Sequence, residues 1–214
     1  MKALAQLSAK SRVQNGMEAV AALERDAQLM LRVREGDETS FALLLQRHRG
    51  PVVNFLHRMV QNRAISEELA QEVFLRVYRS RGTYEPTAKF TTWLFRIATH
   101  LALNAIRDGR KLKGHESLDC EVRDGVVLDG AARHVTDRQP SAEQELIRAV
   151  KVKEIRQAIQ ALPDKQRAAV LMHKYQGLGY TQIAGALRCS ESAVKSLLFR
   201  AYETLRARLA DVRL

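Results

Sequence analysis

The stretch between residues 108 and 143 restricts the fold more than any other part of this sequence. It has five glycines and prolines and no sustained helical period, whereas the segments on either side repeat apolar residues every three or four positions. A connection of this length is longer than a compact domain normally accommodates as a loop. We therefore predict an all-α chain with two small helical domains joined by a flexible linker.

Charge divides the chain at the same places. Residues 1–107 have 16 Lys and Arg against 10 Asp and Glu, residues 108–143 have 6 against 8, and residues 144–214 have 13 against 6. The net charge is +11, which indicates a polyanionic partner, either nucleic acid or an anionic membrane surface. No apolar run approaches the roughly 18 residues of a membrane span, and the first ten residues lack the apolar core of a secretion signal. We expect no membrane insertion and a cytoplasmic location.

Metal, cofactor and catalytic motifs are missing from the sequence. Cys120 and Cys189 are its two cysteines, far apart and without a CxxC motif, and none of the six histidines forms an HExxH pattern. Clustered carboxylates, a nucleophile with a base at motif spacing and a phosphate-binding glycine loop are also missing. We expect no metal site, no cofactor and no catalytic residue, and hence a protein that is not an enzyme.

Apolar periodicity predicts four helices before the linker. Gly50 is expected to end a helix, Pro51 to begin the next, and Ser66 to cap a third. Residues 81–89 are expected to form a loop that leads into a fourth helix.

After the linker, the pattern predicts four shorter helices. Ser141 has capping-box spacing before the first, and Pro163 starts the second, with Tyr175 pointing inward. Two glycines, Gly177 and Gly179, then end that helix.

The strongest local motif is TQIAGALRCSESAVKSLLFRAYETL at residues 181–205, which has helix-turn-helix spacing. Apolar residues of the first helix would pack on Val194 and its neighbours in the second, which Ser190 would cap. The outward residues would meet base edges and phosphates in a major groove. They are Glu191, Ser192, Lys195, Ser196, Phe199 and Arg200. The alternative is an ordinary helical hairpin with a solvated basic face, and the net charge favours DNA binding.

A second cluster interleaves aromatic and cationic residues between positions 84 and 113. Tyr84, Phe90, Trp93 and Phe95 alternate with basic residues, which suits single-stranded DNA because bases stack on rings and phosphates need neutralising. Each aromatic residue taken alone is more often part of a core, and it is the clustering that favours a binding site.

Three stretches together resemble a known family. EELAQEVFLRVYRS (residues 67–80), FTTWLFRIATHLALNAIR (90–107) and ALPDKQRAAVLMHKYQGLGYTQIAGALRCSESAVKSLLFRAYETLR (161–206) are similar to regions two and four of extracytoplasmic-function sigma factors, in the family's order. The resemblance implies an extension at residues 1–25 without an assigned role, a region 2 domain at 26–107, a linker at 108–140 and a region 4 domain at 141–214.

The resemblance also implies roles for individual residues. Region 2 of the family docks on the clamp helices of the largest polymerase subunit, and the matching residues are Glu68, Gln71, Glu72, Phe74 and Arg79. The loop and helix that follow melt the −10 element and capture a flipped base, which costs a few kcal/mol of lost stacking. The matching residues are Lys89, Thr91, Thr92, Trp93, Arg96, His100, Asn104 and Arg107.

Region 4 of the family reads the −35 element, roughly two helical turns of DNA away. The matching residues are Ser192, Lys195, Ser196, Phe199 and Arg200, and the helix around residues 171–175 would meet the polymerase flap. The implied partners are therefore core RNA polymerase and promoter DNA, together with an inhibitory anti-sigma factor. Because the linker tethers two modules, neither needs high affinity alone.

This sequence departs from the family pattern at several positions. Leu197 and Tyr202 stand where arginines are common, Arg188 occupies a turn position that commonly holds glycine, and His100 and Asn104 replace the common Asn and Asp. A positive φ at Arg188 would cost on the order of 1 kcal/mol.

Other classes of protein remain open on the sequence alone. A transcriptional regulator with the same helix-turn-helix that does not bind polymerase would normally carry an α/β domain, which the first half does not predict. A nucleic-acid enzyme lacks the motifs described above. A helical module that binds an acidic protein through its basic faces is the third alternative.

Overall fold

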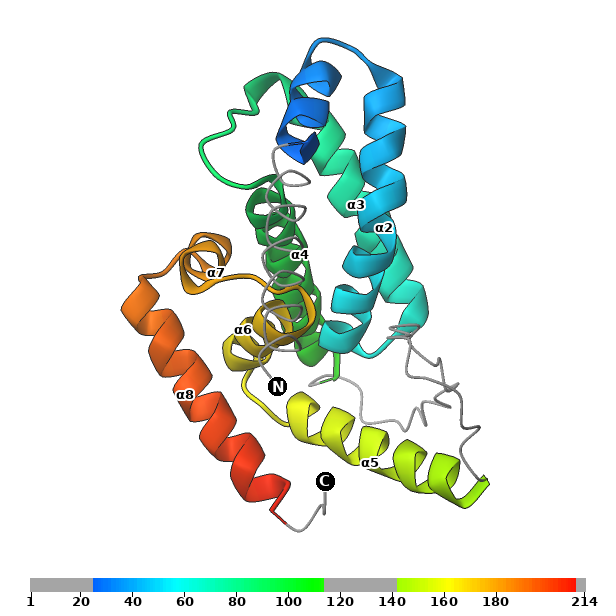
Figure 1. Ribbon diagram of the computed structural model, residues 1–214, viewed down its shortest axis with the longest axis vertical. Coiled ribbons are helices and arrows are strands. Elements are labelled where there is room, and N and C mark those ends of the chain that lie inside the picture. Colours follow the sequence, from blue (N-terminus) through cyan, green and yellow to red (C-terminus); the bar gives the residue numbers. More distant parts are fainter. Residues whose placement is uncertain (1–24, 114–141, 211–214) are drawn as a thin grey trace, which may run out of the picture.

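The computed structural model describes residues 25–113 and 142–210, and every regular element within these ranges is a helix (Figure 1). The all-α prediction is therefore confirmed. The first half has helical residues 25–34, α2 (Glu38–Val60), α3 (Arg63–Arg79), the short 3₁₀ helix η1 (Arg81–Thr83) and α4 (Phe90–Lys113). The second half has α5 (Ala142–Gln160), α6 (Asp164–Tyr175), α7 (Tyr180–Leu187) and α8 (Glu191–Arg208). The predicted cap Ser141 and most of the predicted linker and extension lie outside the described residues.

Helix α2 runs straight through the glycine and proline that were expected to divide it. Pro51 lies inside the helix, so the prediction of two helices was wrong. A proline there removes one backbone hydrogen bond. The inward face nevertheless continues in register across it, from Leu44 and His48 to Val52 and Phe55, all buried. Burial of one continuous apolar face outweighs the lost bond.

Helix α3 begins four residues earlier than predicted. Asn62 is its N-cap and accepts a hydrogen bond from the Ile65 amide at 3.0 Å. Ser66, the predicted cap, is fully buried in the first turn, where its hydroxyl donates to the Asn62 carbonyl. Asparagine and serine are equally good caps, so the choice between them depended on tertiary burial that local sequence does not reveal.

Helix α4 also extends beyond its predicted end. It continues to Lys113 and therefore includes Gly109, so residues 108–113 are helical rather than part of the linker. A glycine inside a helix costs only about 1 kcal/mol relative to alanine, and a strongly amphipathic helix tolerates that cost.

A buried polar contact fixes the first helical residues to α2. Asp26 is 3% exposed and lies 2.9 Å from Nε2 of His48, itself buried, and it also pairs with Arg47. A buried carboxylate needs such partners because desolvation would otherwise be costly. The contact places helical residues 25–34 against the core that α2, α3 and α4 share.

The second half follows its predicted order more closely. Pro163 precedes the first residue of α6, and α7 and α8 occupy nearly the predicted ranges. One side chain differs from expectation, because Tyr175 is 46% exposed rather than inward.

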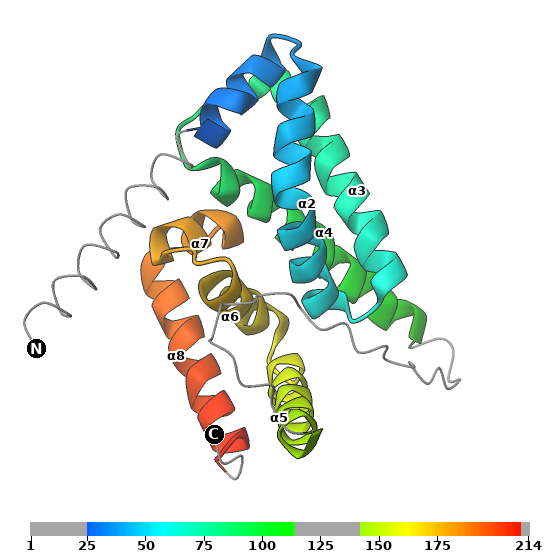
Figure 2. The same ribbon diagram turned by 45° about the vertical axis from the view of Figure 1, so that its right-hand side comes forward.

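The two halves pack directly against each other. Helix α7 packs on α4, and α6 packs on α2 (Figure 2). One continuous set of buried apolar residues includes Phe90 and Leu94 of α4 together with Leu171 and Ile183 of the second half. Sequence organisation predicted two domains and did not predict this contact.

Arg188 has a left-handed backbone at the end of α7. Its φ is 52° and its ψ is 53°, and its amide donates to the Ala184 carbonyl. The next amide, of Cys189, donates to the same carbonyl at 3.1 Å, which closes the helix end. Side chains with a Cβ adopt this conformation only with strain.

We expect Arg188→Gly to raise the free energy of unfolding by about 0.5–1 kcal/mol, because glycine adopts a positive φ without strain. Urea unfolding followed by circular dichroism measures the change. Arg188→Ala is the matched control, since it removes the guanidinium and keeps the Cβ. An equal gain for alanine would show that backbone strain is not the cause.

Candidate nucleic-acid and protein interfaces

The helix-turn-helix is built as the sequence predicted. Ile183 of α7 is fully buried against Val194 and Leu198 of α8, and Ser190 caps α8 by accepting from the Ala193 amide at 3.2 Å. The Thr181 hydroxyl donates to the Glu191 carboxylate at 2.6 Å, which joins the starts of the two helices. These contacts hold α8 at a fixed angle to α7.

The predicted DNA-reading residues all lie exposed on α8. Ser192, Lys195, Ser196, Phe199 and Arg200 face solvent, and the last four line a shallow depression. Phe199 is 67% exposed, although phenylalanine side chains are usually buried in a core. Arg200 donates through Nε to the Ser196 carbonyl at 3.2 Å, which orients its guanidinium along the helix. The face combines cationic, hydroxyl and apolar groups, which suits a DNA groove.

Tyr202 links α8 to α6. Its hydroxyl lies 2.9 Å from Nδ1 of His173 on α6, and the His173 ring stacks on Tyr180 at 5.6 Å. Burial raises the pKa of Tyr202, with a smaller contribution from Tyr180. Tyrosine at a position where the family often has arginine therefore braces α8 against α6 and α7. Leu197, the other departure, packs against the core.

The aromatic cluster in the first half belongs mostly to the core. Tyr84, Phe90 and Phe95 are 3%, 0% and 2% exposed, so their prediction as stacking surfaces was wrong. Trp93 alone is half-buried, with its ring 5.0 Å from Tyr84 and 6.0 Å from Phe90. The buried rings thus hold one partly accessible indole at the start of α4.

Polar residues lie just before α4 and along it on either side of Trp93. Lys89, His100 and Arg107 are exposed, while Arg96 and Asn104 are half-buried. The Asn104 amide nitrogen lies 3.1 Å from Nε2 of His100, so these two side chains form one hydrogen-bonded unit. This line of donors beside an indole suits the unpaired bases and phosphates of an opened strand.

Two of the predicted −10 residues, Thr91 and Thr92, differ from the others in the burial and hydrogen bonding of their side chains. Thr91 is half-buried, with its hydroxyl oxygen buried and without a hydrogen-bond partner. Thr92 is 7% exposed and accepts a hydrogen bond from the Gln182 amide of α7 at 3.3 Å. In this arrangement Thr92 is covered by the helix-turn-helix and cannot touch DNA.

Helix α3 presents a polar outer face. Glu68, Gln71 and Arg79 are exposed, and Glu72 accepts from Arg76 at 2.6 Å. Phe74, predicted on this face, is 5% exposed and packs in the core, so it cannot contact a partner.

Leu75 is an exposed apolar residue of that face which sequence reasoning missed. It is 42% exposed, one residue after the buried Phe74. Its position three residues after Glu72 and four before Arg79 places all three on one side of a helix. This spacing from Glu72 and Arg79 could have predicted from the sequence that Leu75 lies on the polar face of α3.

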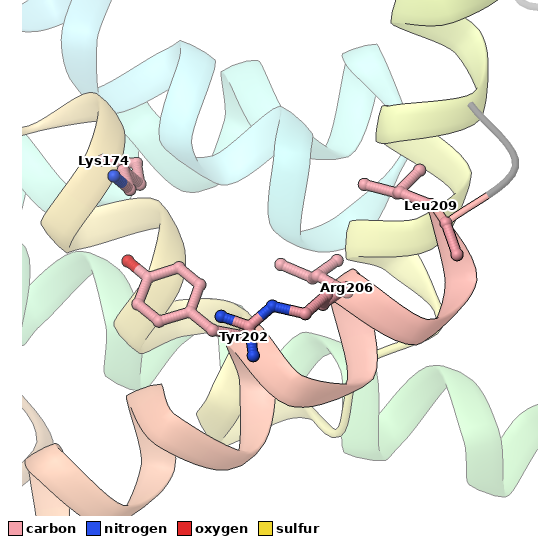
Figure 3. Close-up of a pocket in the computed structure, with 6 residues that line it drawn as sticks. Lys174, Tyr202, Arg206 and Leu209 are labelled. Carbon is pink, nitrogen blue, oxygen red and sulfur yellow. The ribbon is translucent and has the colours of Figure 1, made fainter. Parts of the chain in front are cut away.

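A hollow lies between α6 and the C-terminal part of α8 (Figure 3). It is lined by Lys174, Tyr202, Leu205, Arg206, Leu209 and Ala210. The Lys174 ammonium lies 5.7 Å from the centre of the Tyr202 ring. Leu171 and Met172, predicted near a polymerase contact, are fully buried, so the outward residues of this region are Lys174 and Tyr175.

Within the described ranges, no helix is long and apolar enough to cross a membrane, and no group of His, Cys, Asp and Glu could hold a metal ion.

The first half carries α4, a helix with a polar and partly aromatic face, and the second half carries a helix-turn-helix. This combination is typical of a DNA-binding protein. The family models for sigma-70 region 2 and sigma-70 region 4 match residues 44–112 and 153–205. The chain belongs to the extracytoplasmic-function group of the sigma-70 family of RNA polymerase sigma factors, which are transcription initiation factors.

Curated relatives match over most of their length. The chain is 36% identical over 186 residues to RNA polymerase sigma factor CarQ of Myxococcus xanthus, covering 86% of this chain and 98% of CarQ. It is 31% identical over 183 residues to RNA polymerase sigma-H factor of Pseudomonas aeruginosa, covering 85% and 92%. ECF RNA polymerase sigma factor SigW of Bacillus subtilis is 31% identical over 180 residues, covering 84% and 94%.

Solved structures agree on the fold. CnrH, in complex with the cytosolic domain of CnrY, matches with a TM-score of 0.60 and 20% identity, covering 89% of this chain and 99% of CnrH. Sigma factor RpoE, in complex with the anti-sigma factor NepR from Bartonella quintana, matches with a TM-score of 0.57 and 20% identity, covering 79% and 96%.

The burial of Phe74 and the exposure of Leu75 give a direct test of the α3 face. Phe74→Ala should lower the free energy of unfolding by about 3 kcal/mol, because it leaves a cavity in the core. Leu75→Ala should lower it by less than about 1 kcal/mol. Thermal and urea unfolding of the two neighbouring variants measure the difference. Equal losses would contradict the orientation of α3.

Proposed function

We propose that this protein directs core RNA polymerase to specific promoters, with α8 reading the −35 element as duplex and α4 holding the opened −10 strand. The supporting observation is that one chain joins an exposed cationic reading helix to a second helix with an accessible indole and a line of donors. Duplex readout and single-strand capture require these two kinds of surface. A regulator that only bound duplex DNA would have no use for the second surface.

Contacts with polymerase are proposed for two other surfaces. Glu68, Gln71, Glu72 and Arg79 of α3, with Leu75 among them, suit the clamp helices because they combine charge with one exposed apolar anchor. The flap is proposed to meet the region of Lys174 and Tyr175 beside the hollow of Figure 3. The polymerase supplies the chemistry of transcription, and we propose no catalytic activity for this chain and a cytoplasmic location.

An anti-sigma factor is a further proposed partner. RpoE of Bartonella quintana is in complex with an anti-sigma factor, and the fold is shared with this chain. Exposed apolar side chains such as Leu43, Leu75, Val150 and Val152 offer surface that an inhibitor could cover.

The −35 assignment predicts a specific loss in Arg200→Ala. A side-chain contact to a base is worth about 1–3 kcal/mol, so run-off transcription from a −35-dependent promoter should fall by roughly 5- to 150-fold. Arg208→Ala is the matched control, because it removes the same charge from the far end of α8. Association of both variants with core polymerase, measured by gel filtration, should be unchanged. Unaltered transcription by Arg200→Ala would refute this assignment.

The −10 assignment predicts that Trp93→Ala impairs strand opening more than duplex binding. Stacking on an aromatic ring is worth about 1–3 kcal/mol per base, so permanganate reactivity of the opened thymines should fall several-fold. Trp93→Phe keeps a ring and should retain more of that reactivity. Binding to a duplex −35 fragment serves as the internal control for folding. Wild-type reactivity in Trp93→Ala would count against the role of the indole.

A further inference from the structure

We propose that Asp26 and His48 are positioning residues for strand opening, because their buried hydrogen bond fixes the orientation of the Trp93 indole through the Phe90 ring. The inference rests on the proposed function for the role of Trp93. The fixed orientation itself rests on contacts among four buried side chains and the indole. These come from the helical segment 25–34, α2, the loop before α4 and the start of α4.

Neither Asp26 nor His48 can touch a DNA strand, because their side chains are only 4% and 9% exposed. A buried carboxylate is costly unless it has partners. Both oxygens of Asp26 have one, since Oδ1 pairs with Arg47 and Oδ2 lies 2.9 Å from Nε2 of His48. Any effect of this pair on strand opening must therefore pass through other side chains.

The hydrogen bond sets the orientation of the His48 ring. The last side-chain torsion of histidine has a broad range of its own, and the contact with Asp26 selects the orientation in which Nε2 faces the carboxylate. In that orientation the His48 ring centre lies 5.3 Å from the Phe90 ring centre, and the two planes are tilted by 51°. Asp26 thus determines which surface His48 presents to Phe90.

Phe90 extends this constraint to Trp93. It is fully buried at the first position of α4, and its ring centre lies 6.0 Å from that of Trp93 at an interplanar angle of 60°. Such tilted pairs are a favoured arrangement of aromatic rings. A fully buried ring cannot rotate without displacing its neighbours in a close-packed core. The orientation of His48 therefore limits the orientations open to the indole.

The segment 25–34 also supports the indole from a second side. Nη1 of Arg34 donates to the Tyr84 carbonyl at 3.4 Å, and the Tyr84 ring centre lies 5.0 Å from that of Trp93. Burial raises the pKa of Tyr84, and the negative charge of Asp26 adds to that rise. The carboxylate is therefore close enough to act on the phenol, and both routes to Trp93 begin on the same segment.

An indole that is held in place suits base stacking. A base stacks only on a ring face that lies in the right plane, and a side chain ordered beforehand loses little conformational freedom on binding. Trp93 is half-buried, so part of its ring is accessible while Tyr84 and Phe90 hold the rest. Asp26 and His48 are therefore expected to favour capture of the strand without touching it.

The orientation of the indole can be measured directly. Trp93 is the only tryptophan in the sequence, so the tryptophan band of the near-ultraviolet circular dichroism reports on this residue alone. Asp26→Ala in the full-length protein should remove most of this band and increase acrylamide quenching of the Trp93 fluorescence. The helical signal in the far ultraviolet should be unchanged. Asp26→Asn keeps an acceptor for His48 and should retain most of the band.

Asp37→Ala is the matched control. Asp37 caps α2 by accepting from the amide and the hydroxyl of Ser40, at 3.1 and 2.7 Å, and it lies outside the chain of contacts to Trp93. Its replacement removes a carboxylate and a helix cap, and it should leave the tryptophan band and the quenching unchanged. An unchanged band in Asp26→Ala, or an equal loss in Asp37→Ala, would overturn the positioning role.

Strand opening is then measured with core polymerase as a double-mutant cycle. Asp26→Ala should lower the permanganate reactivity of the opened thymines by about 2- to 3-fold, less than Trp93→Ala does, because the ring is still present. In the Trp93→Ala background the same substitution should cause no further loss, since a positioning residue acts only through the residue that it positions. Losses that multiply in the double variant would show a general effect on stability and would overturn the proposal.

Failure of the proposed function gives a different result. Wild-type reactivity in Trp93→Ala alone would reject the role of the indole in strand opening, and the band of Asp26→Ala would still decide whether the pair orients Trp93. If Asp26→Ala does not fold, His48→Gln takes its place, because it keeps a donor for Asp26 and removes the ring that meets Phe90. It should also lose the band, and a wild-type band would contradict the contact path through Phe90.

Discussion

The packing of α4 is the constraint on which the rest of the structure depends. One side of this helix, with Phe90, Leu94 and Ala98 fully buried, closes the core of the first half. A second side, with Thr92 and Thr99, is covered by α7 and α6 of the second half. The proposed DNA surface of α4 faces solvent and lies next to this second, covered side. Any change in how the two halves pack therefore changes which side chains of α4 are exposed.

The features that the sequence predicted well are those set by neighbouring residues. The helix-turn-helix follows from the alternation of Ile183, Val194 and Leu198 with polar positions and from the cap at Ser190, all within a few turns. The exposed reading residues on α8 follow from the same period, because inward positions determine outward ones. The start of α6 after Pro163 is likewise a local effect of the proline ring.

The features that the sequence did not predict depend on contacts between distant segments. Local rules favoured a break at Pro51, and only the shared core shows why α2 continues through it. Aromatic residues beside cations suggested a stacking surface, yet Tyr84 and Phe95 fill the core and leave Trp93 accessible. The approach of Gly185 to Thr92 joins residues 93 positions apart and leaves no periodic signal in either helix.

The central claim is that one chain reads duplex DNA with α8 and holds an opened strand with α4 while it is bound to core polymerase. Run-off transcription with purified core polymerase on a library of promoter fragments tests this claim most directly. The account predicts that the protein co-elutes with core polymerase in gel filtration and that the mixture gives promoter-specific transcripts which core polymerase alone does not give. Absence of such transcripts from protein that co-elutes with core polymerase would contradict it.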